Sequence, residues 1–301
     1  MALDLRPLTL AELLDRSFST YKRHLWLFVG IMAVPAACAV VYAVAMQLFN
    51  ATLQPDTPPD QILFQMIPMF VGALVFSVAY LITYAFALGA TTIAVAGIYT
   101  DQPVSVGSSY RDVRRHGWRL ILLLLWGTLR VTGVWLGAMV LTGLIGALLS
   151  LGSPVLGGIF FVLGLFGGAV LAGFLAVRYG VSVSAVVLEH LTAGRALKRS
   201  IELTEDHRGR VFLLILCAVV ISYATTALLQ GPFMAGAFLA GPGTPVAIVL
   251  TIAGAVLGGI GTMFSGPIMI IGLAMMYYDL RIRKEALDLQ IMLDSLDAPR
   301  T

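Results

Sequence analysis

The chain has 301 residues, of which 59% are hydrophobic and 12% are charged, with a net charge of +3 and a mean hydropathy of +0.92. A soluble protein of this size has no interior large enough to hide so much apolar surface. A nucleic-acid-binding domain would need more charge on a water-exposed surface. We therefore expect a polytopic membrane protein that is surrounded by the lipid bilayer and has no nucleic-acid partner.

The chain begins with a charged amphipathic segment at residues 8–24, "LTLAELLDRSFSTYKRH". Thr9 and Glu12 have the spacing of a capping box, which predicts the start of a helix. The chain then runs without a charge from Leu25 to Pro55, which exceeds the about 20 apolar residues that cross a bilayer. This run is too long for a secretory signal and lacks a small-residue cleavage site, so we expect no such signal.

Two further basic segments, at 103–119 and 192–210, also precede long apolar runs. The first is the weaker amphipathic helix, and Ser105 is its candidate cap. Clusters of Pro and Gly, which break helices, divide the apolar runs into pairs. The predicted spans are 26–49, 63–87, 126–149, 154–177, 211–230 and 246–276. The predicted turns within the pairs are 50–61, 150–154 and 230–245.

One pattern occurs three times: an amphipathic helix, a span, a turn and a returning span. We predict an all-α fold, a polytopic helical membrane protein with six transmembrane helices as three hairpins, each preceded by a cytoplasmic amphipathic helix. A single membrane domain at 1–279 would hold pseudo-repeats at 8–99, 103–190 and 191–279, followed by a cytoplasmic amphipathic tail at 280–301.

Lys and Arg gather in the segments that join one hairpin to the next, while the turns within the hairpins hold none. By the positive-inside rule, the basic segments and both termini are predicted to be cytoplasmic. In the tail, Arg281 and Glu285 have the i,i+4 spacing of an ion pair. The predicted cytoplasmic basic anchors are Lys22, Arg23, Arg114, Arg115, Arg119, Lys198, Arg199, Arg281, Arg283 and Lys284.

Residues with catalytic or metal-binding chemistry are sparse. The sequence contains no Walker A loop, no GxSxG elbow and no HExxH motif. Cys38 and Cys217 lie inside apolar runs, as expected for free buried thiols. His24, His116 and His207 recur before spans; an interfacial position is favoured over a shared metal site. We expect no catalytic residue, no metal and no cofactor.

Ionisable residues inside apolar stretches are candidate functional residues. Arg130, Arg178 and Glu189 qualify, although Arg178 can also simply extend to the interface. We predict that Glu189 forms a buried ion pair with Arg130 or Arg178. Two apolar stretches, Leu120–Leu129 and Tyr179–Leu188, exceed what a span needs, so we expect the amphipathic helices to cover them in a packed cytoplasmic layer.

Glycines four residues apart allow helix backbones to approach closely in lipid. Packing within the bundle is the favoured interpretation of these pairs, and a homodimer face is the alternative. The pairs are Gly133 and Gly137, Gly164 and Gly168, and Gly254 and Gly258.

Three segments carry a family resemblance: "RPLTLAELLDRSFSTYKRH" (6–24), "LEHLTAGRALKRSIELTEDHRGRVFLL" (188–214) and "MMYYDLRIRKEALDLQIML" (275–293). They resemble the glycerophosphoryl diester phosphodiesterase membrane-domain family of bacterial integral membrane proteins. In that family the phosphodiesterase activity belongs to a separate soluble barrel, and nothing in this chain matches that barrel. The resemblance therefore implies a membrane protein without that activity.

Two functions are expected. The first is a non-enzymatic protein of the bacterial cytoplasmic membrane that acts as an assembly or scaffolding partner of another membrane or envelope system, or as a homo-oligomer. The alternative is a transporter or lipid-handling protein, whose basic face suits anionic lipid head groups. A transporter needs a polar cavity near mid-bilayer, and few polar residues were found in the spans: Ser77, Thr83, Thr91, Thr92 and Arg130.

Overall fold

The computed structural model describes the backbone of residues 8–52 and 59–285, and every regular element in these ranges is helical. The elements are α1 (Leu10–Arg23), α2 (Leu25–Thr52), α3 (Pro59–Tyr99), α4 (Val106–Val113), the 3-10 helix η1 (Arg114–His116), α5 (Gly117–Ser150), α6 (Pro154–Arg178), α7 (Ser182–Leu188), α8 (Ala193–Thr204), α9 (Arg208–Ala240) and α10 (Pro245–Glu285).

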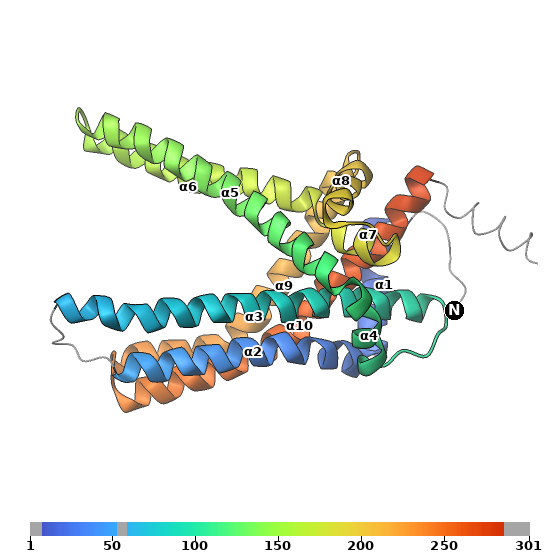
Figure 1. Cartoon of the computed structure of the whole chain (residues 1–301), viewed down its shortest axis with the longest axis horizontal. Coiled ribbons are helices and arrows are strands. Elements are labelled where there is room, and N and C mark those ends of the chain that lie inside the picture. The colour runs from blue at the N-terminus through green and yellow to red at the C-terminus, as the bar shows by residue number, and fades with distance from the viewer. Residues whose placement is uncertain (1–7, 53–58, 286–301) are drawn as a thin grey trace, which may run out of the picture.

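These helices repeat one order three times (Figure 1). α1 precedes α2 and α3, α4 and η1 precede α5 and α6, and α7 and α8 precede α9 and α10. Within the described residues, six helices are long and apolar enough to cross a bilayer. The chain is therefore an all-α, multi-pass membrane protein built from three hairpins, which confirms the predicted fold class. The boundaries of the pseudo-repeats and of the membrane domain stay predictions.

The amphipathic helices begin at the predicted caps. The Thr9 hydroxyl accepts from the Glu12 amide at 3.2 Å, and the Glu12 carboxylate accepts from the Thr9 amide at 2.7 Å. Ser105 and Ser108 form the same reciprocal arrangement at the start of α4. Each pair satisfies backbone amides that a helix start leaves free, so local sequence fixes where these helices begin.

Tyrosines attach two amphipathic helices to spanning helices. Pro35 has no amide hydrogen, so it frees the carbonyl of Ile31 one turn earlier in α2. The Tyr110 hydroxyl of α4 donates to that carbonyl at 2.7 Å. The Tyr21 hydroxyl of α1 likewise donates to the Phe264 carbonyl of α10 at 2.6 Å. These two amphipathic helices are therefore held against the spanning helices.

Several helices extend beyond the predicted spans; α3, for example, continues past the predicted span end at 87 to Tyr99. α9 passes through Pro232 to Ala240, and the chain turns at Gly241 and Gly243, which have φ of 85° and 77°. Leaving the helix inside lipid would expose unbonded peptide groups, which costs more than a proline kink, so the chain turns only where glycines permit positive φ. α10 continues without a break through the predicted start of the tail to Glu285. The rest of that predicted tail, 286–301, lies outside the described residues.

Four spanning helices, α2, α3, α9 and α10, lie together, while the α5–α6 hairpin diverges from them (Figure 1). α5 and α6 pack along each other, and so do α9 and α10. The hairpin contacts the rest of the chain mainly at the start of α5 and the end of α6, through α3, α7, α8 and α9. We call the α5–α6 hairpin the arm.

The buried side chains concentrate at the end of the molecule where the amphipathic helices lie. Leu120 and Leu123 at the start of α5 are 1% exposed. Val181 and Ala185, around the start of α7, are fully buried. The predicted packed layer over the excess apolar stretches is therefore confirmed for these residues, but not for the second half of Leu120–Leu129, where Leu125 and Leu129 are 49% and 59% exposed. Farther along the arm, side chains such as Leu148 are exposed and suit contact with lipid tails.

Two of the three predicted glycine pairs lie at helix contacts. A Cβ at Gly164 or Gly168 would collide with α5, and a Cβ at Gly254 or Gly258 would collide with α9 side chains. No atom lies within 4 Å of a Cβ built at Gly133 or at Gly137.

The topology gives a direct prediction. We expect a reporter that is active only outside the cytoplasm to be active when inserted at Gly152 or Gly243, because the arginine-rich ends of the helices lie on the opposite side. The same reporter inserted at Asp101 should be silent. Activity at Asp101 with silence at both glycines would invert the predicted orientation.

Candidate functional site

The C-terminal end of α10, "YYDLRIRKE" (277–285), contacts the N-terminal segment, the end of α7, α8 and α9 through its charged side chains. Four basic and acidic positions in this stretch form two groups on different sides of the helix. We call them the Asp279 cluster (Leu8, Arg210, Asp279 and Arg283) and the Glu189 cluster (Glu189, Arg199, Tyr277, Arg281 and Glu285).

The Asp279 cluster holds a carboxylate with no solvent exposure. Asp279 accepts from the Leu8 amide at 2.8 Å, and it pairs with Arg210 at 3.2 Å and Arg283 at 3.0 Å. Both guanidinium groups also donate to the Leu8 carbonyl at 2.6 Å. Because burial of an unpaired charge is costly, these contacts must form together, and they fix the segment before α1 to α9 and α10.

The Glu189 cluster joins the end of α7 to α8 and α10. Arg199 donates to Glu189 at 3.1 Å and also contacts Glu285. Arg281 pairs with Glu285 at 2.9 Å, which confirms the predicted i,i+4 contact, and lies 3.7 Å from Glu189. The Tyr277 hydroxyl donates to Glu189. Burial opposes the charge of Arg199, but its hydrogen bonds and attraction to the two carboxylates raise its pKa overall.

These contacts correct the predicted ion pair. Glu189 bonds Arg199 and Arg281, and neither Arg130 nor Arg178 contacts it. The reason is that the chain turns after α7 and brings Glu189 back onto α8, whereas Arg130 lies on the exposed surface of the arm. Arg178 instead lies over the Phe174 ring at 5.9 Å.

The predicted basic anchors divide into two groups. The first group pairs with carboxylates of the protein and therefore serves packing: Arg199, Arg281, Arg283 and Lys284. The second group is exposed, as a membrane-surface anchor requires: Lys22, Arg23, Arg114, Arg115, Arg119 and Lys198, of which Lys198 also lies 4.0 Å from Glu202. Lys284 pairs with Asp206 at 2.8 Å, and this hydrogen bond lowers the pKa of the Asp206 carboxyl.

The recurring histidines do not meet. His116 of η1 instead contacts His190 at 2.8 Å, with the two rings stacked. Within the described residues, no group of three His, Cys, Asp or Glu side chains could hold a metal ion.

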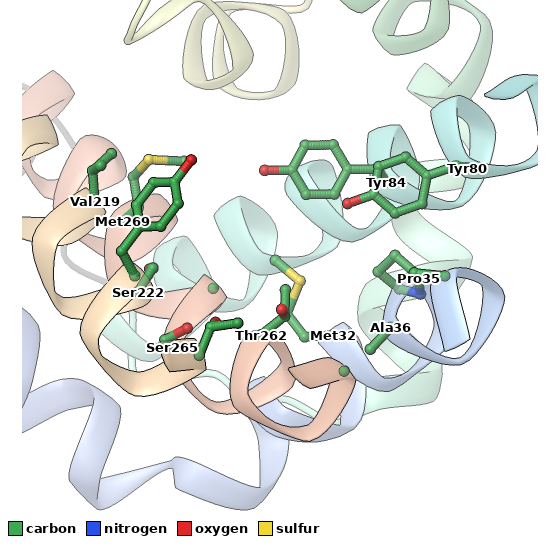
Figure 2. Close-up of a pocket in the computed structure, with 15 residues that line it drawn as sticks. Met32, Pro35, Ala36, Tyr80, Tyr84, Val219, Ser222, Thr262, Ser265 and Met269 are labelled. Carbon is green, nitrogen blue, oxygen red and sulfur yellow. The ribbon is translucent and has the colours of Figure 1, made fainter. Parts of the chain in front are cut away.

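A cavity of about 350 Å³ lies between α2, α3, α9 and α10 (Figure 2). It exists because small side chains face it, including Ala36, Ala39 and Gly259. The lining contains hydroxyl groups but no charged side chain. Pro35 in the cavity wall lies one helical turn from Ile31, whose carbonyl binds Tyr110 of α4, so the cavity begins just beyond the amphipathic helices.

The hydroxyl groups of the cavity are of two kinds. Thr262 and Ser265 donate to carbonyls of their own helix, as Thr and Ser commonly do in membranes. The hydroxyls of Tyr80 and Tyr84 point into the cavity from α3 (Figure 2) and have no hydrogen-bond partner among the described residues. An unpaired hydroxyl away from water costs free energy, so these groups are available to a bound molecule.

A row of aromatic rings extends along α3 into the cavity. Tyr42 of α2 stacks on Phe76 with ring centroids 3.9 Å apart. Phe76 is followed by Tyr80 at 5.5 Å, and Tyr80 by Tyr84 at 5.6 Å. Of these four rings, Tyr80 and Tyr84 line the cavity.

The polar residues that the sequence indicated do not line this cavity. Ser77, Thr83 and Thr92 donate to carbonyls of their own helix, and Thr91 is buried. The sequence holds a weak indication of the cavity. Tyr80 and Tyr84, like Ser222 and Thr226, are four residues apart, so each pair shares one face of its helix. Nothing in one helix alone, however, shows that these two faces meet.

A family model described as Domain of unknown function (DUF7847) matches residues 29–280, from α2 to the last turns of α10. The chain belongs to this family. The match includes all four helices around the cavity and Asp279. No curated protein and no solved structure matches the chain.

The corrected ion pair gives a double-mutant prediction. We expect Glu189→Gln and Arg199→Gln each to lower the free energy of unfolding in detergent by roughly 1–3 kcal/mol. The double variant should lose less than the sum, by on the order of 1 kcal/mol, because the partners contact each other. As a control, Glu189→Gln and Arg130→Gln should be additive. If the effects of Glu189→Gln and Arg199→Gln are also additive, the contact between these two residues contributes nothing to the free energy of unfolding.

Proposed function

We propose that the protein is a non-enzymatic, lipid-handling protein of the bacterial cytoplasmic membrane, with both termini in the cytoplasm. It binds one uncharged lipid in the cavity between α2, α3, α9 and α10. The observation that supports this proposal is the cavity of about 350 Å³ among the spanning helices, with tyrosine hydroxyls that lack a partner among the described residues. The sequence makes lipid handling the alternative to scaffolding. The cavity among the spanning helices favours lipid handling over scaffolding.

The lining restricts the chemistry of the ligand. A charged group in the cavity would lose its hydration and meet no opposite charge, so the part of the ligand that occupies the cavity is neutral. Phenol hydroxyls donate, so Tyr80 and Tyr84 favour a carbonyl or ether oxygen on the ligand. The two tyrosine rings and the thioethers of Met32 and Met269 favour an apolar body. A neutral lipid with a carbonyl group meets these requirements.

The arm favours scaffolding as a second candidate function. Large apolar side chains along it are exposed in this chain, among them Leu148, Phe166 and Val170. A scaffolding or assembly partner, either another membrane protein or a second copy, would cover this surface. We include in this proposal the resemblance to the glycerophosphoryl diester phosphodiesterase membrane-domain family. That resemblance implies that this chain itself catalyses no hydrolysis.

Lipid analysis tests the cavity. We expect protein purified from native membranes to retain a neutral lipid that Ser222→Leu excludes by filling the cavity. Tyr84→Phe removes one donor and should reduce retention by about fivefold, as expected for loss of one hydrogen bond of about 1 kcal/mol. The measurement is mass spectrometry of lipids extracted from the purified protein.

Ser77→Leu is the matched control, because Ser77 lies on the exposed surface of α3 and bonds its own helix. It should retain the lipid at the wild-type level. The same neutral lipid content in wild type, Ser222→Leu and Ser77→Leu would refute a ligand in this cavity.

A further inference from the structure

Two arginines at the cytoplasmic end of the arm lie near one aromatic ring. Arg178 is the last residue of α6, and Arg208 is the first residue of α9. Their guanidinium carbons lie 5.9 and 5.5 Å from the centroid of the Phe174 ring. Two positive charges are thus held close together where α6 and α9 meet.

These arginines differ from the arginines of the Asp279 and Glu189 clusters. Arg199, Arg210, Arg281 and Arg283 each contact a carboxylate at the sites described above. Among the described residues Arg178 pairs with no carboxylate, and its buried Nε has no hydrogen-bond partner.

Arg208 is almost as poorly neutralised. Its Nε is also buried without a partner, and its one ion-pair contact, Glu205, is 3.8 Å away and 62% exposed. Next to it, the buried Nδ1 of His207 has no partner either. Burial, and then the positive charges of Arg283 and Arg210, lower the pKa of His207. The site therefore has donors and positive charge in excess of its acceptors.

We propose that Arg178 and Arg208 bind the phosphate of an anionic phospholipid from the inner leaflet. Guanidinium groups bind phosphate oxygens through forked pairs of hydrogen bonds. Both arginines terminate spanning helices, so they lie at the level of the head groups.

The ring positions indicate a lipid rather than free phosphate. Phe174 precedes Arg178 by four residues, and Phe212 follows Arg208 by four residues, so both rings lie one helical turn deeper, about 6 Å. Phe174 is 48% exposed and Phe212 is 50% exposed. The acyl chains of a lipid held at the arginines would cover these two rings. This site is separate from the cavity and does not depend on what the cavity binds.

Native mass spectrometry of the detergent-purified chain, titrated with phosphatidylglycerol, tests this site. Arg178→Gln with Arg208→Gln should weaken binding by about thirty-fold, because each basic residue near an anionic surface contributes a factor of about five. Arg111→Gln with Arg195→Gln removes the same charge from exposed positions and should change the affinity less than twofold. Ser222→Leu should have no effect.

Several results would overturn the proposal. Equal loss in both double variants would show only a general charge effect. Equal binding of phosphatidylcholine would exclude recognition of an anionic lipid, and displacement of the lipid by inorganic phosphate would indicate a free-phosphate site. If the glutamine variant does not fold, Arg178→Lys with Arg208→Lys keeps the charge but removes the forked donors. Unchanged affinity in that variant would exclude the proposed phosphate geometry.

Discussion

The buried carboxylate of Asp279 is the constraint on which the packing of α9, α10 and the segment before α1 depends. A charge with no solvent exposure is tolerated only when its partners are in place, and here they come from three parts of the chain: Leu8, Arg210 and Arg283. Leu8 precedes α1, Arg210 lies in the first turn of α9, and Arg283 lies one turn after Asp279 in α10. Folding of this end is therefore expected to be cooperative, because none of these segments satisfies the charge alone.

Side chains are closely packed at the end of the molecule that holds the amphipathic helices, and less closely packed along the rest of the spanning helices. The packed layer and the ion-pair clusters hold the bases of the helices, while side chains such as Leu148 and Val170 of the arm meet no other part of the chain. Lipid tails are as apolar as these side chains, so no hydrophobic force closes the bundle there. This explains how the arm diverges from the four-helix group, and how small residues such as Ala36 and Gly259 leave a cavity among four spanning helices.

Features set by local chemistry could be predicted from the sequence. The spans follow from apolar length, the start of α1 from Thr9 and Glu12, and the Arg281–Glu285 pair from helical spacing. Partners that depend on tertiary structure could not be predicted. Glu189 meets Arg199 because the chain reverses after α7, and no periodicity encodes that reversal. The cavity was missed for the same reason, since each of its helices contributes only a few uncharged side chains.

The central claim is tested most directly by the thermal stability of Asp279→Asn in detergent. We expect a loss of roughly 3–5 kcal/mol, because Arg210 and Arg283 would remain buried without their carboxylate. Asp206→Asn is the control: it also removes the carboxylate partner of a basic α10 residue, Lys284, but at an exposed position, so its stability should stay close to wild type. An Asp279→Asn protein as stable as the Asp206→Asn control would contradict a structure organised around this buried charge.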